Sequence, residues 1–91
     1  MTVTVPQVSW YVYIVRCDDN TLYTGISTDP ATRVIEHNSG QNGAKYTRAR
    51  RPVTLVYTEQ AASRSAALKR EITIKRLSRQ AKLALINKLE P

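Results

Sequence analysis

Cysteine is nearly absent from this 91-residue chain, and its scarcity narrows the kinds of structure the chain can form. Cys17 is the only cysteine, which excludes an internal disulfide and argues against a cysteine-based zinc site. Long hydrophobic runs are also missing, since none approaches the ~20 residues that a membrane-spanning helix needs. The first nine residues have neither the positive start nor the apolar stretch of a signal peptide, which predicts a cytoplasmic protein.

Internal repeats, low-complexity segments, a helix-turn-helix signature and a zinc-finger pattern are likewise absent. The length corresponds to one domain with a single small core. The hydrophobic content of 42% is ordinary for a globular protein. We expect residues 1–9 to form a flexible arm, because Pro6 disfavours regular strand pairing, and residues 10–91 to form the single domain.

Positive charge is plentiful and unevenly distributed. The chain carries a net charge of +7, made up of −2 in residues 1–44 and +9 in residues 45–91. A basic half indicates a polyanionic partner such as nucleic acid. Charge alone is equally compatible with a basic protein whose charged face is simply solvated.

A β-hairpin is predicted near the N-terminus. Residues 10–17 are rich in Tyr, Val and Ile, which favour strands, and residues 21–26 form the return strand. The polar residues 18–20 between them are typical of a turn. A three-residue loop places Tyr23 diagonal to Tyr13 on the same face of the sheet, whereas a two-residue loop would place the two rings on opposite faces.

A helix is predicted after the hairpin. Thr28 or Asp29 can cap it, and Pro30 is favoured in its first turn. The helix should end near residue 38 or 39, with Val34 and Ile35 as its core anchors.

The second half of the chain contains a predicted loop, strand and two helices. Two glycines and a proline indicate a loop over residues 40–52, and residues 53–57 are a third strand. A helix is expected over residues 66–76, with Leu68 and Ile72 on its buried side. Ser78 can cap a last helix whose inward side chains are Leu83, Ile86 and either Leu85 or Leu89. The resulting fold class is α+β: a small three-stranded antiparallel sheet flanked by helices, in the order strand, strand, helix, strand, helix, helix.

Two tyrosine-centred triplets carry most of the functional information. Tyr11-Val12-Tyr13 lies in the first strand and Tyr23-Thr24-Gly25 in the second, while Arg33 and His37 follow at i,i+4 spacing and Glu71 lies on a later helix. In this order and at these spacings the residues resemble the GIY-YIG nuclease family. The chain is most similar to its short single-domain bacterial members, the group known as UPF0213.

Further segments support the resemblance, and two positions depart from it. Residues 43–47 and 52–57 are similar to hallmarks of the short members. Tyr11 stands where the family name has glycine, and Thr24 where it has isoleucine. The family often has a late asparagine near its site, and Asn87 is the only late asparagine here.

The resemblance implies a site that hydrolyses phosphodiester bonds with one Mg²⁺ or Mn²⁺ ion. Glu71 would hold that ion, because Mg²⁺ normally keeps several waters and uses one or two protein carboxylates. Arg33 would contact phosphate oxygens with its planar guanidinium. Tyr23 would take the proton from water, with Tyr13 orienting it. His37 is an alternative base or phosphate contact, since it titrates nearer neutrality.

A basic segment next to this site is expected to contact nucleic acid. Its residues are Lys45, Tyr46, Arg48, Arg50 and Arg51. The implied substrate is DNA, with duplex, branched and single-stranded forms left open and RNA not excluded. A protein partner is one possible source of specificity.

Each of these residues also has an ordinary structural explanation. A strand tyrosine usually packs, and Glu71 can form an ion pair with Lys75 at i,i+4. The alternative functions are a non-catalytic nucleic-acid-binding module and an interaction subunit that works only in a complex.

Overall fold

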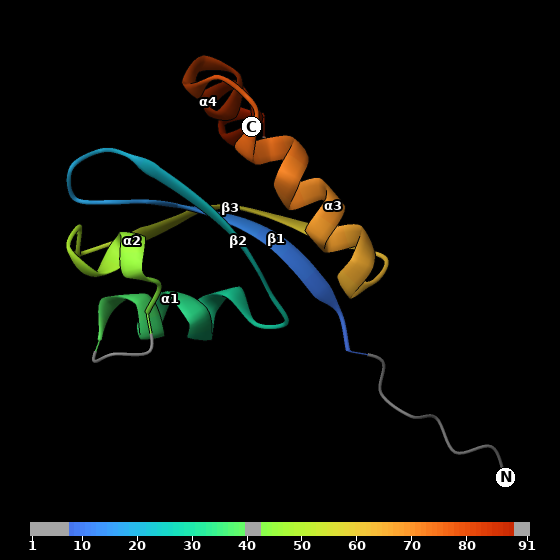
Figure 1. The fold of residues 1–91 in the computed structure, drawn as a ribbon, viewed down its shortest axis with the longest axis horizontal. Coiled ribbons are helices and arrows are strands. Elements are labelled where there is room, and N and C mark those ends of the chain that lie inside the picture. The colour runs from blue at the N-terminus through green and yellow to red at the C-terminus, as the bar shows by residue number, and fades with distance from the viewer. Residues whose placement is uncertain (1–7, 40–42, 89–91) are drawn as a thin grey trace, which may run out of the picture.

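The computed structural model describes residues 8–39 and 43–88. Within them, three antiparallel strands form one sheet in the order β2-β1-β3, with helices on both of its faces (Figure 1). The strands are β1 (Trp10–Arg16), β2 (Leu22–Ser27) and β3 (Thr54–Ala61), and the helices are α1 (Pro30–Asn38), α2 (Lys45–Arg48), α3 (Arg64–Lys75) and α4 (Arg79–Asn87). This arrangement confirms the expected α+β class.

The central strand β1 is buried on both faces. Val12 and Ile14 point into a core cluster with α3 and α4, whereas Tyr13 and Val15 point into a second cluster on the side of α1 and α2. Side chains alternate between faces along a strand, so the apolar run of β1 supplies both clusters at once. Figure 1 shows α1 and α2 on one side of the sheet and α3 and α4 on the other.

The hairpin has the predicted three-residue loop. Tyr13 pairs with Gly25, and the Cys17 amide donates to the Thr21 carbonyl at 2.8 Å. Asn20 closes the turn in the left-handed region with φ 69°, as is common in three-residue hairpin loops. Tyr13 and Tyr23 therefore lie on the same face of the sheet, as expected.

Helix α1 begins and ends where the sequence predicts. The Asp29 carboxylate accepts from the Thr32 amide at 3.2 Å and caps the helix. Val34 packs against the second cluster and His37 is fully buried. Ile35 does not anchor the helix, because its position between these two inward residues turns it outward and leaves it 65% exposed.

The end of α1 is tied to the start of β3. The Asn38 side-chain NH2 donates to the Val53 carbonyl at 2.9 Å, and the Val53 amide donates to the Asn38 side-chain Oδ1 at 2.7 Å. Arg51 donates through Nε to the carbonyl of His37, which lies in the last turn of α1. These bonds fix the position of His37 above the sheet.

Two segment predictions need correction. Residues 45–48 of the predicted loop form the short helix α2. Lys45, Tyr46, Thr47 and Arg48 give no apolar periodicity, so the sequence pattern did not reveal this turn. The third strand does not end at residue 57 but continues to Ala61, because its second half pairs with β1 as far as Trp10.

The inward face of α3 also differs from the prediction. Ala67 and Ile74 are buried, and Glu71 lies between them at i,i+4 and i,i+3 spacing with its side chain 17% exposed. Ile72 is 49% exposed and Leu68 is only partly buried. The helix is rotated so that a carboxylate, rather than the apolar Ile72, lies on the face directed towards the protein.

Ser78 caps α4 as predicted, with its hydroxyl accepting from the Ala81 amide at 3.1 Å. Ile86 is buried, and both Leu83 and Leu85 pack against the first cluster. Leu89 and most of the expected N-terminal arm lie outside the described residues. No helix in the described part of the chain is long and apolar enough to cross a membrane.

Candidate active site

A buried hydrogen-bonded chain connects β1, α1 and α2. The Tyr13 hydroxyl lies 2.8 Å from His37 Nε2, and the Thr47 hydroxyl lies 2.8 Å from His37 Nδ1. All three side chains are almost completely buried. The sequence pattern predicts Tyr13 and His37 as site residues but not Thr47, although Thr47 lies in the segment 43–47 that resembles a family hallmark.

The direction of donation along the Tyr13–His37–Thr47 hydrogen bonds follows from the Thr47 end. When Thr47 donates its single hydroxyl proton to the Ala44 carbonyl at 3.0 Å, it accepts from His37 Nδ1–H. His37 Nε2 then carries a lone pair and accepts from the Tyr13 hydroxyl. The Ala44 amide also approaches Nδ1, but at 3.4 Å this contact is too long to decide the tautomer.

Glycine provides the space for this chain at two places. A Cβ at Gly25 would lie 2.5 Å from the Tyr13 hydroxyl oxygen, so only glycine allows the Tyr13 ring to cross β2. A Cβ at Gly43 would lie 2.9 Å from the His37 Cα, because the polypeptide backbone at Gly43 passes close to the end of α1. The third residue of the second triplet therefore has a steric role that the motif alone did not indicate.

Tyr23 is the accessible member of the tyrosine pair. Its ring meets the His37 ring edge-on at 5.4 Å and stacks on Tyr46 at 5.8 Å. The Arg50 guanidinium lies 4.0 Å from the centre of the Tyr46 ring and forms a 3.0 Å ion pair with Asp19 in the hairpin loop. Tyr46 therefore braces Tyr23, and Arg50 locks both against the hairpin.

Burial dominates the protonation of these groups. It raises the pKa of Tyr13 to about 12, an effect that nearby Tyr23 adds to and Arg33 opposes through hydrogen bonding and charge. Burial also raises the pKa of Tyr23, which Arg33 lowers and Glu71 raises. The pKa of His37 is lowered by burial and then by Arg33. At neutral pH both phenols are protonated and His37 is neutral.

Arg33 and Glu71 complete the predicted set from opposite sides. Both lie close enough to act electrostatically on Tyr13 and on Tyr23. Arg33 also lies 3.8 Å from Glu36 on its own helix. Glu71 Oε1 lies 3.8 Å from Lys75 Nζ, the ion pair that the i,i+4 spacing allows. Tyr13, Tyr23 and His37 thus contact one another, and Arg33 and Glu71 influence both phenols electrostatically.

The donor set suits a single hard cation with few protein ligands. Across residues 8–39 and 43–88, no three His, Cys, Asp or Glu side chains gather as a metal-binding group. Both nitrogens of His37 are already engaged. Glu71 remains as one carboxylate near the site, which fits Mg²⁺ or Mn²⁺ completed by water and substrate phosphate.

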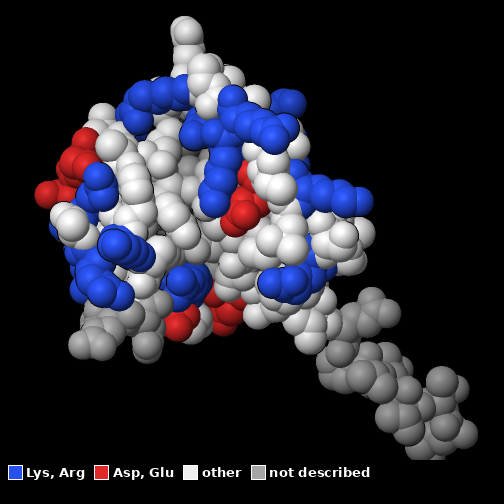
Figure 2. Space-filling view, in the orientation of Figure 1, with Lys and Arg blue, Asp and Glu red and all other residues white. Residues whose placement is uncertain are grey.

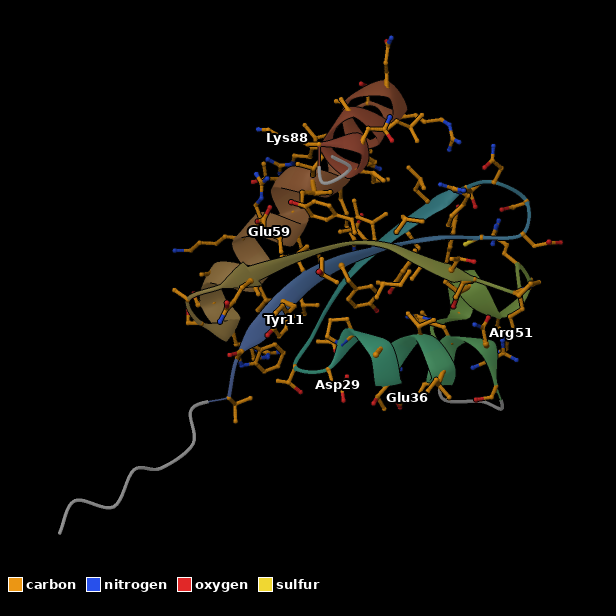
Figure 3. The ribbon with its side chains drawn as sticks, turned by 180° about the vertical axis from the view of Figure 1, so that it is seen from behind. Tyr11, Asp29, Glu36, Arg51, Glu59 and Lys88 are labelled. Carbon is orange, nitrogen blue, oxygen red and sulfur yellow. The ribbon has the colours of Figure 1, made fainter. Side chains whose placement is uncertain are left out.

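The basic segment is partly committed to internal contacts. Arg50 bonds to Asp19 and to the Tyr46 carbonyl, and Arg51 bonds to the end of α1, where Figure 3 places it. Lys45 and Arg48 are exposed. Contact of this segment with nucleic acid stays a prediction, with Arg50 and Arg51 also serving the fold.

Two other residues lie away from the tyrosine–histidine group. Asn87 is exposed at the end of α4, the helix that packs on the opposite face of the sheet. Tyr11 lines a cavity of about 330 Å³ together with the start of α1. Figure 3 shows Tyr11 and Asp29 at the same end of the molecule, with Arg51 beyond the other end of α1.

Comparison with known sequences identifies one family over most of the chain. A family model described as the GIY-YIG catalytic domain matches residues 9–84. A UPF0213 protein of Desulfotalea psychrophila is 56% identical over 82 residues, which are 90% of this chain and 74% of that protein. A UPF0213 protein of Staphylococcus saprophyticus is 58% identical over 77 residues, 85% of this chain and 93% of that protein.

Solved structures give the same result. The solution NMR structure of a UPF0213 protein from Bacillus halodurans has a TM-score of 0.57 and 43% identity, and the match covers 89% of this chain and 85% of that one. The solution NMR structure of a protein from E. faecalis has a TM-score of 0.61 and 40% identity, with 90% and 86% covered. Fold and sequence therefore agree over the segment that contains all five predicted site residues.

Proposed function

Because the chain belongs to the GIY-YIG nuclease family, we propose that it is a metal-dependent endonuclease that hydrolyses DNA phosphodiester bonds with little sequence preference. The resemblance drawn from the two tyrosine triplets is confirmed by the family match. The observation that carries the proposal is the meeting of the Tyr13–His37 pair with Tyr23, with Arg33 and Glu71 near both phenols. Phosphodiester hydrolysis needs a proton acceptor, a positive group for phosphate oxygens and a cation-binding carboxylate, and this set supplies all three.

Tyr23 is the proposed proton acceptor for the attacking water. It is partly exposed, whereas Tyr13 is buried and hydrogen-bonded to His37. The charge of Glu71 now raises the pKa of Tyr23, so neutralising that charge favours the phenolate. The positive charge of Arg33 also lowers the pKa of Tyr23.

His37 is proposed as a positioning residue rather than as the base. Its ring is fully buried, and both nitrogens are bonded, to Tyr13 and to Thr47. It holds Tyr13 in place and presents its ring edge to Tyr23. The alternatives in which His37 abstracts a proton or contacts phosphate would require these bonds to break first.

A divalent ion bound by Glu71 would stabilise negative charge on the phosphate and on the departing oxygen. Arg33 would bind the phosphate oxygens with its guanidinium. Lys45 and Arg48 would hold the flanking backbone without reading sequence. DNA shape, branching or a protein partner would then set the choice of substrate.

A cleavage assay at low salt tests the proposal. Labelled duplex, branched and single-stranded DNA would be incubated with Mg²⁺, Mn²⁺ or EDTA, with Tyr23→Phe and Glu71→Gln proteins in parallel. We expect metal-dependent cutting that both variants lose by about 100-fold or more, as for the loss of a general base, while DNA binding by Tyr23→Phe is retained. Absence of cutting, with salt-sensitive binding that neither variant changes, would instead assign the chain as a non-catalytic nucleic-acid-binding module.

A further inference from the structure

We propose that Lys75 forms an ion pair with the Glu71 carboxylate in the free protein, and that this pair breaks when nucleic acid binds, which leaves the carboxylate to a divalent ion. This inference rests on the proposed function, in which Glu71 is the metal-binding carboxylate. Lys75 would then couple metal binding to the presence of substrate, a role separate from the family's tyrosine, arginine and glutamate set.

Two contacts place the Lys75 ammonium near both Glu71 and Tyr23. Its Nζ lies 3.8 Å from Glu71 Oε1 and 5.9 Å from the centre of the Tyr23 ring. The same cation therefore faces both the proposed metal-binding carboxylate and the proposed proton acceptor. The i,i+4 spacing on α3 favours the pair, as does the position of Lys75 in the last turn of the helix.

A lysine at this place competes with a metal ion. A divalent ion binds a carboxylate oxygen at about 2.0–2.6 Å, and an ammonium a few ångströms from the same oxygen would repel it. Lys75 neutralises the carboxylate that the metal needs. In the free protein, metal binding by Glu71 is therefore weakened.

The pair is weak enough to exchange. The Lys75 side chain is 50% exposed, and solvent-exposed ion pairs contribute little to stability. A flexible four-carbon stem lets the ammonium move to a phosphate oxygen, a strong acceptor for lysine. Nucleic acid at the site would thus draw Lys75 away and leave Glu71 to the metal.

The test measures Mn²⁺ binding in the absence of nucleic acid, by electron paramagnetic resonance of free Mn²⁺. Lys75→Gln removes the competing cation, and Lys69→Gln is the matched control because Lys69 is exposed on the same helix and carries the same charge. We expect Lys75→Gln to bind Mn²⁺ about three- to five-fold more tightly than the unmodified protein, the size of a weak exposed pair. Lys69→Gln should change the affinity by less than about two-fold, and Lys75→Arg should leave it unchanged.

A second readout separates this role from simple DNA contact. In the cleavage assay, Lys75→Gln should reach half-maximal activity at lower Mg²⁺ and yet turn over more slowly at saturating Mg²⁺, because a phosphate contact is lost. Circular dichroism would verify that each variant is folded.

The outcomes distinguish this inference from the proposed function. Equal Mn²⁺ affinities of Lys75→Gln and Lys69→Gln overturn the role of Lys75, as does undetectable Mn²⁺ binding by Lys75→Gln. Mn²⁺ binding that persists in Glu71→Gln overturns the assignment of the metal-binding carboxylate instead. Tighter binding by Lys75→Gln that is lost in the Glu71→Gln, Lys75→Gln double variant supports both.

Discussion

At the scale of single residues, the site depends on side chains that hold other side chains. Tyr13 and His37 are buried, and Thr47 fixes the imidazole from the opposite side. Buried polar chains of this kind are stable only when every member is satisfied. Removing one member therefore affects geometry as well as stability, and its effect should extend to Tyr23, which contacts the His37 ring.

Replacing Thr47 with valine tests the direction of this chain. Valine keeps the shape but removes the acceptor for His37 Nδ1–H, so we expect a loss of about 1–3 kcal/mol in the free energy of unfolding. The tautomer of His37, followed by ¹⁵N-correlated NMR, should become mixed, and cleavage should slow. Thr47→Ser keeps the hydroxyl and is the control. A His37 tautomer that is unchanged in Thr47→Val would contradict the assignment.

The pH dependence of stability provides a second test at this scale. His37 is the only histidine, and its folded pKa is lowered by burial. The unfolded chain therefore takes up the proton first as the pH falls through about 6.5, and the folded state loses stability below that value. The stability that the neutral, buried His37 contributes is fully present above about pH 6.5.

Urea unfolding between about pH 7.5 and about pH 5.5 would measure this loss. We expect the midpoint to fall over this range for the unmodified protein and to change much less for His37→Gln. An equally large fall in His37→Gln would assign the effect to other groups.

At the scale of elements, the sequence predicted what local chemistry determines. The Asp29 cap fixed the start of α1, and the polar turn before Thr21 fixed the hairpin register. The sequence pattern did not predict α2. Its four residues have no apolar period, and its N-cap, Ala44, makes no side-chain hydrogen bond. Such a turn is held by tertiary contacts, here the bond between Thr47 and His37.

The orientation of α3 shows why the site was harder to predict than the fold. Apolar patterning placed Ile72 inward, but the face that includes Ala67, Glu71 and Ile74 is the one that packs. A partly buried carboxylate breaks the amphipathic pattern on which such predictions rest. The family motif identified Glu71, and the structure explains why periodicity could not.

The junction between α1 and β3 gives a prediction at this scale. Asn38→Ala removes both bonds to the Val53 backbone, so we expect a loss of about 1–3 kcal/mol in the free energy of unfolding. Hydrogen exchange of the Val53 amide should accelerate, because that amide loses its acceptor. Ser39→Ala is a nearby control, since its hydroxyl bonds to the Ile35 carbonyl within α1. Unchanged exchange at Val53 would show that Asn38 does not hold the junction.

At the scale of the whole molecule, positive charge borders the site from two sides. Figure 2 shows Lys and Arg side chains over the side of α3 and α4 and again over the side of α1 and α2, with mostly uncharged surface and one acidic patch between them. The basic second half of the sequence thus folds onto both flanks of the sheet. An incoming polyanion would meet positive charge on either side of the tyrosines.

The salt dependence of DNA binding tests whether the α2 segment is part of this surface. Each phosphate that the protein neutralises adds about one unit to the slope of log affinity against log salt concentration. Lys45→Gln and Arg48→Gln should each reduce the slope by about one unit, whereas Lys88→Gln, at the end of α4 (Figure 3), should not. The measurement is fluorescence anisotropy on labelled DNA at several salt concentrations without metal.

Because all three residues are exposed and carry the same charge, equal changes in the three variants would mean that net charge rather than the α2 segment drives binding. A change confined to Lys45→Gln and Arg48→Gln would place the DNA backbone beside Tyr46, on the side from which Tyr23 is braced.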